Sequence, residues 1–266
     1  MPISVPSLLP RVRTALVDGP GGLSRLLPIA VPMIISQLFD TAMMFVDRLF
    51  LSRVSPLAMA SCMTGGLTAF LCSHLVFGVV AYCSTLVAHR YGAGRREECP
   101  VVVIQAVWIA CAAYPLVLLA GRVAVNAFAW AGHTPEQVAL ETAYFRIIIV
   151  SSILGLLRAA FSGFFAGIGK TRVIMCGNAL ALATNITANY VLIFGKWGAP
   201  ALGIVGAALG TALAAGVMMG TMAVAFFLYV RRPPFRGRRL FAADRTACRQ
   251  LLRYGLPSGL EGFVGI

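Results

Sequence analysis

The feature that most constrains this sequence is a succession of long apolar runs, each separated from the next by a short polar stretch. A helix needs roughly 20 mostly apolar residues to cross a bilayer. Runs of that length recur along the 266 residues, and they are continuous rather than alternating, which argues against a membrane β-barrel. The sequence therefore predicts an all-α polytopic membrane protein.

The apolar runs predict a six-helix transmembrane bundle followed by the start of a seventh helix. We expect spans at 26–51, 57–89, 101–121, 140–167, 172–195 and 201–230, with the seventh beginning near residue 251. The domain boundaries follow: a cytoplasmic N-terminal segment over 1–25, the bundle over 26–230, a basic cytoplasmic linker over 231–250 and a truncated seventh helix over 251–266.

The sequence around the last boundary carries two further expectations. Residues 243–255 have the pattern of a short amphipathic helix on the inner membrane face. Too few residues then remain for a full crossing, and a helix that stops in lipid leaves carbonyl groups unpaired. We therefore expect the chain to be a fragment of a longer protein.

The net charge of +13 is explained by the linkers. Arginine and lysine are concentrated at the N-terminus and in the second, fourth and sixth linkers, which the positive-inside rule places in the cytoplasm. No basic patch alternates with base-stacking aromatic residues, so nucleic acid is not an expected partner. The densest cluster, in the sixth linker, is interpreted as an orientation signal, with binding of anionic membrane lipid as the alternative.

The sequence offers no catalytic or metal-binding set. The seven cysteines are scattered without a CxxC pair, and the three histidines are far apart. Nucleophile-elbow, P-loop and zinc-protease motifs are all missing. We expect no enzyme activity, no metal and no cofactor, and interpret the cysteines as small apolar core residues.

Two carboxylates in the first span stand out, because a charge at bilayer depth costs about 2.5–3.5 kcal/mol. Asp40 and Asp47 are seven residues apart, which places them on nearly the same helix face. Each needs a proton, an ion partner or a water-filled cavity. The alternatives are a surface ion pair of Asp47 with Arg48, and a structural hydrogen bond from Asp40 to a neighbouring helix. Pro32 is expected to kink this helix and make it a moving part, with gentle static curvature as the alternative.

Two later spans carry matching polar and small residues. Asn178, Asn185 and Asn189 form one stripe of the span 172–195, either as a polar lining or as hydrogen bonds that join helices. The span 201–230 adds the hydroxyl of Thr211 and a face of small residues for close packing, formed by Gly203, Gly206, Gly210 and Gly216.

Several phrases of the sequence together resemble the MATE (multidrug and toxic compound extrusion) family of secondary transporters. They are LPIAVPMIISQLFDTAMMFVD at 27–47, TLVAHRYGAGRREE at 85–98, FSGFFAGIGKTR at 161–172, NITANYVLIFG at 185–195, GIVGAALGT at 203–211 and YGLPSGLE at 254–261. The resemblance implies twelve helices in two six-helix lobes around a cavity, of which this chain supplies the N-terminal lobe and lacks the C-terminal lobe.

The same resemblance implies export of cationic or amphipathic small molecules across the plasma (inner) membrane, in exchange for protons or sodium ions. It makes Asp47 the carboxylate that binds the coupling ion, with Asn185 and Thr211 in the same site. Asn189 stands where a member with a sodium site has aspartate, which favours the proton. Asp40 is a candidate replacement for that missing carboxylate.

Two other functions are compatible with these residues. A related flippase would move lipid-linked saccharide precursors, and it would need a basic central cavity; Arg146 and Arg158 are the intramembrane arginines that could serve it. An inactive truncated product is the second alternative.

Overall fold

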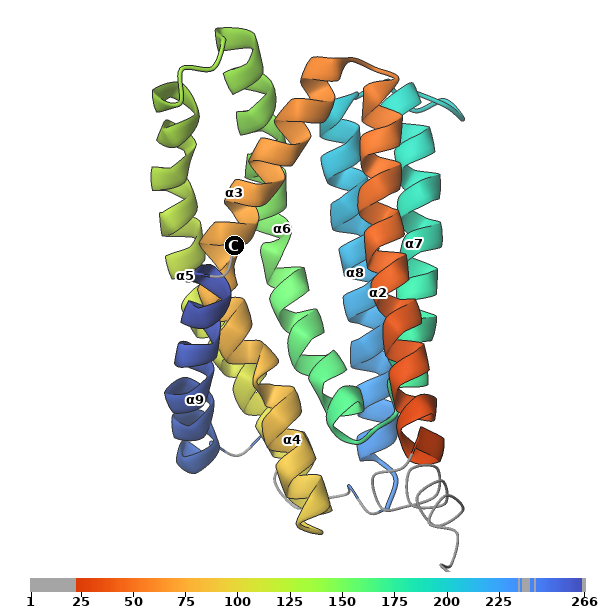
Figure 1. Ribbon diagram of the computed structural model, residues 1–266, viewed down its shortest axis with the longest axis vertical. Helices are drawn as coiled ribbons and strands as arrows, with labels where there is room; N and C mark the ends of the chain where they lie inside the picture. Colours follow the sequence, from red (N-terminus) through yellow and green to blue (C-terminus); the bar gives the residue numbers. More distant parts are fainter. Residues whose placement is uncertain (1–22, 234, 236–239, 242, 265–266) are drawn as a thin grey trace, which may run out of the picture.

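A computed structural model describes residues 23–233, 235, 240, 241 and 243–264, and all its regular structure in these ranges is helical. The helices are α2 (Leu23–Ser52), α3 (Pro56–Ala81), α4 (Cys83–Gly92), the 3-10 helix η1 (Arg96–Glu98), α5 (Cys99–Trp130), α6 (Pro135–Gly167), α7 (Thr171–Phe194), α8 (Ile204–Val230) and α9 (Arg245–Val264) (Figure 1). This confirms the predicted all-α membrane fold of six spanning segments followed by a seventh helix. Most of the predicted N-terminal segment and part of the basic linker lie outside the described residues.

Five stretches of the described residues are long and apolar enough to cross a membrane: Leu26–Ser52, Pro56–Gly92, Arg96–Trp130, Pro135–Gly167 and Ile204–Val230. The predicted span 172–195 does form a helix, α7, but it is less apolar than the other five. Its asparagine and threonine side chains explain the difference, and the same side chains form the site described below.

The observed helix bounds correct three of the predicted ones. The predicted span 57–89 is two helices, α3 and α4, joined through Tyr82. Helix α5 continues to Trp130, well beyond the predicted end at 121. Helix α6 begins at Pro135 instead of 140, because the side chain of Thr134 accepts a hydrogen bond from the Gln137 amide and proline occupies the first helical position.

The C-terminal part differs most from expectation. The sequence predicted an amphipathic helix over 243–255 and a separate seventh helix from 251, but one helix, α9, runs from Arg245 to Val264 and includes Pro257. The predicted boundary between residues 250 and 251 therefore lies inside a helix. Asp244 caps this helix: its Oδ1 atom accepts hydrogen bonds from the amides of Thr246 at 2.9 Å and Ala247 at 3.1 Å.

The connections alternate between the two ends of the bundle. The start of α2, the α4–α5 and α6–α7 connections, the end of α8 and the start of α9 lie at the lower end in Figure 1, and the α2–α3, α5–α6 and α7–α8 connections lie at the upper end. In the part of the chain that the structure describes, the basic residues of the α4–α5, α6–α7 and α8–α9 connections are therefore at one end of the molecule, and the arginine-poor connections are at the other.

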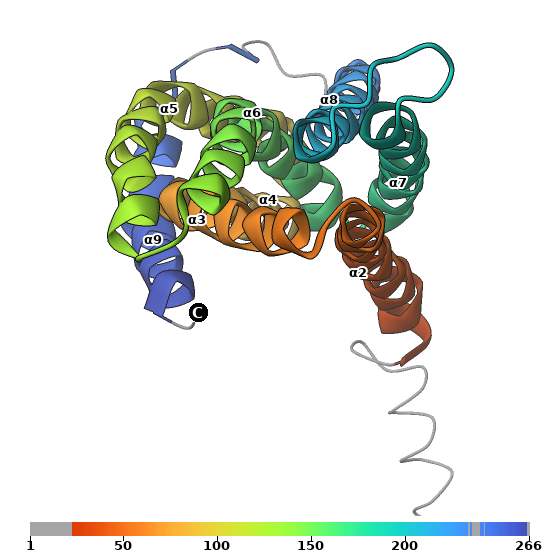
Figure 2. The ribbon, with the colours of Figure 1, turned by 90° about the horizontal axis from the view of Figure 1, so that it is seen from above.

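Seen from above, the helices form two groups that meet along α6 (Figure 2). On one side α2 packs along α7, and α7 packs against α8; on the other, α3 packs against α6 and carries α9 on its outer side. The largest buried cluster includes residues of α4, α5, α6 and α8. Within it, edge-to-face aromatic contacts of Phe164 with Phe226 and Phe235 join α6 to α8 and to the residues that follow it.

Helix α9 approaches α3 closely because glycine faces it. A Cβ atom on Gly255 would lie 2.7 Å from the Cα atom of Val79, and one on Gly259 would lie 2.8 Å from the carbonyl oxygen of Leu75. Beside these contacts the ring of Tyr254 stacks on that of Tyr82, with 5.9 Å between centroids. The first helix after the basic linker is thus packed directly on the six-helix bundle.

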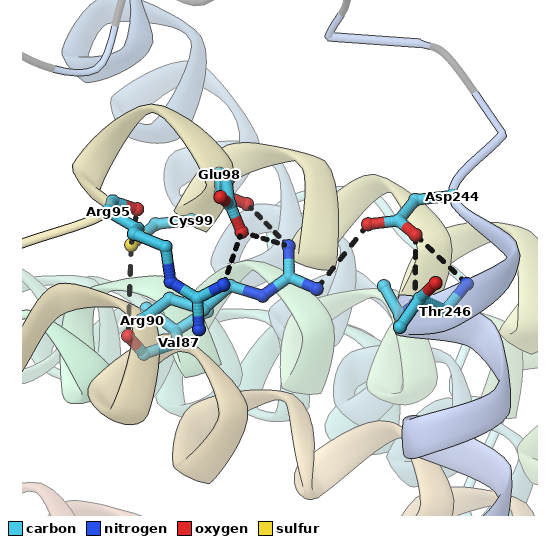
Figure 3. Close-up of polar contacts among 8 residues, drawn as sticks. Val87, Arg90, Arg95, Glu98, Cys99, Asp244 and Thr246 are labelled. Carbon is cyan, nitrogen blue, oxygen red and sulfur yellow. Dashed lines mark hydrogen bonds and ion pairs between the residues drawn. The ribbon is translucent and has the colours of Figure 1, made fainter. Parts of the chain in front are cut away.

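A buried arginine ties the start of α9 to α4 and α5 (Figure 3). The Nη1 atom of Arg90 lies 3.4 Å from both the carbonyl oxygen and a carboxylate oxygen of Glu98, and Nη2 lies 3.4 Å from the carboxylate of Asp244. Since the other carboxylate oxygen of Asp244 caps α9, one side chain both begins this helix and anchors it to the bundle.

Replacing Asp244 by alanine is expected to loosen α9, because it removes the cap, worth about 1 kcal/mol, and one partner of Arg90, worth about another. Asp244→Asn can keep the cap through its Oδ1 atom but presents an NH2 group, which cannot accept a hydrogen bond, to Arg90. It loses one of the two interactions, so its effect should be about half as large. The readout is the rate at which a maleimide modifies Cys248, whose Sγ atom lies 3.1 Å from the Gln105 side chain. We expect the rate to rise most in Asp244→Ala.

Peptide mass spectrometry separates Cys248 from Cys111 and Cys176, which are already exposed and serve as internal references. An unchanged Cys248 rate in both variants would show that these contacts do not hold α9 in place.

Candidate functional site

The carboxylate of Asp47 is at the centre of a polar cluster between α2, α7 and α8. Its side chain is buried, with 7% of the residue exposed. Asn185 Nδ2 donates to Asp47 Oδ1 at 3.0 Å, Asn189 Nδ2 donates to the same oxygen, and Thr211 Oγ1 lies 3.2 Å from Oδ2. The structure therefore brings together Asp47, Asn185 and Thr211, which the resemblance assigned to one site, and places Asn189 with them. The surface ion pair of Asp47 with Arg48 is not among the ion pairs of the described residues.

The two amides of α7 are held in one orientation by their hydrogen bonds. Asn185 and Asn189 are four residues apart, so their side chains lie on the same helix face. Asn189 Nδ2 also donates to Asn185 Oδ1 at 3.1 Å, and this leaves both amide nitrogens directed at Asp47. Because an amide has donors at one atom and acceptors at the other, this network fixes which side each amide presents to the carboxylate.

Glycines of α8 make room for this arrangement. A Cβ atom at Gly210 would collide with Asn189 Oδ1, and one at Gly206 would lie 2.5 Å from the carbonyl oxygen of Leu192. The predicted small-residue face of α8 thus packs on α7 at these two positions. Gly203 lies just before the helix and Gly216 makes only an ordinary contact with Leu154, so neither contributes to the close approach.

Tyr144 and Cys62 complete the cluster and were not predicted as site residues. Tyr144 of α6 is buried, and its hydroxyl interacts with Thr211 and with the thiol of Cys62 on α3. Neither residue has a recognisable sequence signal, because Tyr144 stands between Ala143 and Phe145 and Cys62 has the pattern of a core cysteine. Their role follows only from the packing of α3 and α6 beside α8.

Glu141, one turn before Tyr144, is another buried carboxylate that sequence reasoning missed. It accepts a hydrogen bond from Gln137 Nε2 at 2.9 Å and lies 3.0 Å from His133 Nδ1. Both partners come from the α5–α6 end of the bundle, so this group is satisfied locally.

Asp40 does not join the Asp47 cluster. It faces Asn178 Nδ2 at 3.4 Å and the guanidinium of Arg158 on α6 at 3.7 Å. Asn178 Nδ2 also donates to the carbonyl oxygen of Ser36 at 3.2 Å. The two acids share one face of α2, as predicted, but they belong to separate groups two helical turns apart. The hydrogen bond from Asp40 to a neighbouring helix is present.

Helix α2 is continuous through Pro28 and Pro32. The hydroxyl of Ser36 donates to the carbonyl oxygen of Pro32 at 2.8 Å. The kink predicted at Pro32 does not interrupt the helix, and its part in any movement stays a prediction. In the part of the chain that the structure describes, no group of three or more His, Cys, Asp or Glu side chains could hold a metal ion.

Comparison with known proteins adds the family. The MatE family model matches residues 32–191, which is more than half of the chain. This chain belongs to the MATE family. The probable multidrug resistance protein NorM of Pseudomonas putida is 34% identical over 246 residues, and the NorM protein of Bacillus subtilis is 30% identical over 246 residues.

The MATE chain spans about half the length of these curated relatives. The match covers 89% of this chain and 52% of the Pseudomonas protein, and 91% of this chain and 54% of the Bacillus protein. A solved MATE multidrug resistance transporter in an outward-facing conformation has the same fold, with a TM-score of 0.75 at 23% identity, over 89% of this chain and 52% of that chain. The predicted architecture, one MATE lobe followed by a seventh helix, is confirmed.

Proposed function

We propose that this chain forms part of an antiporter that exports cationic or amphipathic small molecules and takes up a proton on Asp47 in exchange. The names of the curated relatives support export of drugs as the activity. A buried carboxylate with several polar partners in a membrane protein supports an ion-coupling role.

The observation that carries the proposal is that the Thr211 hydroxyl has two hydrogen-bond acceptors within reach. Its Oγ1 atom lies 3.2 Å from Asp47 Oδ2 and 3.0 Å from the carbonyl oxygen of Ala207, and it has one proton to donate. With Asp47 ionised, Thr211 donates to the carboxylate. With Asp47 protonated, the carboxyl group donates to Thr211, which then donates to Ala207. Both protonation states of Asp47 are therefore satisfied by the rotation of one hydroxyl group.

The amide orientations favour the proton over sodium. Asn185 and Asn189 direct their NH2 groups at Asp47, whereas a sodium ion needs oxygen atoms turned toward it. Binding of sodium beside Asp47 would require both amides to turn. In its present position Asn189 Oδ1 lies against Gly210, in space that a Cβ atom at residue 210 would fill.

The proposal includes the setting of the protein. We place it in the plasma (inner) membrane with the N-terminus and the arginine-rich linkers in the cytoplasm, in accord with the charge asymmetry. The partners are membrane lipid, the transported compound and a second MATE lobe. No catalytic step is needed for exchange, so the proposal does not include enzyme activity.

The test is transport by the intact gene product in proteoliposomes. A lipophilic cation is loaded on one side, and its movement is measured under an imposed proton gradient or an imposed sodium gradient of equal size. We expect the proton gradient alone to drive movement. Movement driven only by sodium would replace the proton in the proposal, and no movement under either gradient would contradict antiport.

The flippase alternative needs a basic cavity, and the structure does not favour it. The charge of Arg158 is balanced by Asp40 at 3.7 Å.

A further inference from the structure

We propose that Arg158 is a built-in cation that occupies Asp40 in the empty transporter, and that a transported cation binds by displacing it. This inference rests on the proposed export of cations and assigns that function a binding site separate from Asp47.

Asp40 and Arg158 line a cavity of about 280 Å³ between α2, α3, α4, α6 and α7. Met33, Phe77 and Ile174 supply apolar wall, and Ser84 and Ser162 supply hydroxyl groups. A few charged or polar groups in a mostly apolar hollow suit a compound with an apolar body and one charged end.

The ion pair between Asp40 and Arg158 in this cavity is weak enough for the two side chains to separate. Asp40 and Arg158 approach at a single 3.7 Å contact, and their side chains are 36% and 30% exposed. A tight arginine–carboxylate pair makes two parallel contacts at shorter distances. Asp47, by contrast, is buried and has three donors. Asp40 is therefore the carboxylate whose partner can leave.

Asn178 holds the Asp40 carboxylate in place on the cavity wall. Its Nδ2 atom faces Asp40 and the carbonyl oxygen of Ser36, which fixes the amide and turns Oδ1 away from both. Asn178 is 2% exposed and is hydrogen-bonded to the α2 backbone as well as to Asp40, so the Asp40 carboxylate keeps this partner when Arg158 leaves.

The charge balance of the cavity determines how Arg158 affects the affinity of the cavity for a cation. The empty cavity holds one negative and one positive side chain and is neutral. A bound cation shares Asp40 with a guanidinium that stays nearby, so Arg158 weakens cation binding and favours release. Removal of Arg158 should tighten the binding of cations, which is the opposite of what removal of a supporting contact would do.

The experiment measures equilibrium binding of 4-phenylbutylammonium, which has an apolar body and one charged end, to the purified intact protein, with uncharged 4-phenylbutanol as the matched probe. We expect affinity for the cation to follow the cavity charge. Arg158→Gln should bind about fivefold tighter than wild type and Asp40→Asn about tenfold weaker. The double variant, which is neutral again, should lie within about threefold of wild type, as should Arg158→Lys. The uncharged probe should bind all five proteins alike.

Weaker or unchanged cation binding in Arg158→Gln would overturn the inference, as would parallel changes for the uncharged probe, which indicate a structural role. Failure of the proposed function looks different: proton-driven export would be missing although the order of affinities holds. A wild-type protein that binds no 4-phenylbutylammonium would contradict the inference as well.

Discussion

Asp47→Asn is expected to abolish proton-driven export by the intact protein while leaving its fold in place. Asparagine has the shape of a protonated aspartic acid. Its Oδ1 atom can accept from Asn185 and Asn189, and its NH2 group can donate to Thr211, whose hydroxyl then turns to the Ala207 carbonyl oxygen. The variant is therefore fixed in the state that resembles the protonated site and cannot release a proton.

The measurements are proton-driven transport in proteoliposomes and thermal unfolding of the same preparation. Because the hydrogen bonds are conserved, the free energy of unfolding should change by less than about 1.5 kcal/mol. Glu97→Gln is the matched control, since it removes an exposed carboxylate at the arginine-rich end of the bundle. Export at the wild-type rate by Asp47→Asn would show that another group carries the coupling ion.

Gly206→Ala is expected to destabilise the bundle by about 2–3 kcal/mol, a large effect for one added methyl group. The new Cβ atom would lie 2.5 Å from the carbonyl oxygen of Leu192 and 2.6 Å from its carbonyl carbon. Both are backbone atoms of α7 and cannot move aside as the end of a flexible side chain can, so the two helices must separate. Membrane helices rely on such close packing of small residues for their association.

Separation of α7 from α8 would also disturb the polar cluster, because Asn189 precedes Leu192 by one turn. We expect a lower thermal unfolding midpoint together with reduced export. Gly220→Ala is the control on the same helix, where nothing lies within 4 Å of the added Cβ; it should be neutral or stabilising by up to about 1 kcal/mol. Equal stability of the two variants would mean that the close approach of α7 and α8 does not support the fold.

Local patterns were enough to predict most of the architecture. Continuous apolar runs identify spanning helices because a single segment in lipid can pair its backbone groups only as a helix. The predicted helix bounds are wrong where a helix continues beyond its apolar run. Helix α6 extends past its apolar run to a capping threonine, and α9 joins an amphipathic stretch to an apolar one. Neither the capping threonine nor the junction within α9 changes the length of an apolar run, so a prediction from apolar length could not locate these helix ends.

The candidate site was predictable to the extent that it depends on spacing along single helices. Asp47, Asn185 and Thr211 could be named from the family resemblance, and the face that Asp40 shares with Asp47 follows from their seven-residue separation. What each acid pairs with depends instead on how α2 meets α6 and α7. The contact of Asp40 with Arg158, and the place of Tyr144 beside Thr211, arise from residues more than 60 positions apart and have no signature in the sequence.

The glycine contacts between α9 and α3 have a consequence for the order in which the protein is made. Helix α3 is synthesised more than 160 residues before α9, so the surface around Leu75, Gly78 and Val79 faces lipid throughout the insertion of the remaining bundle. That surface of α3 has no helix packed on it until α9 is made. The backbone of α3 is approached there only when Gly255 and Gly259 emerge, and the Arg90 side chain must wait equally long for Asp244. The bundle is therefore complete only when α9 packs on α3, after all its other helices have been made.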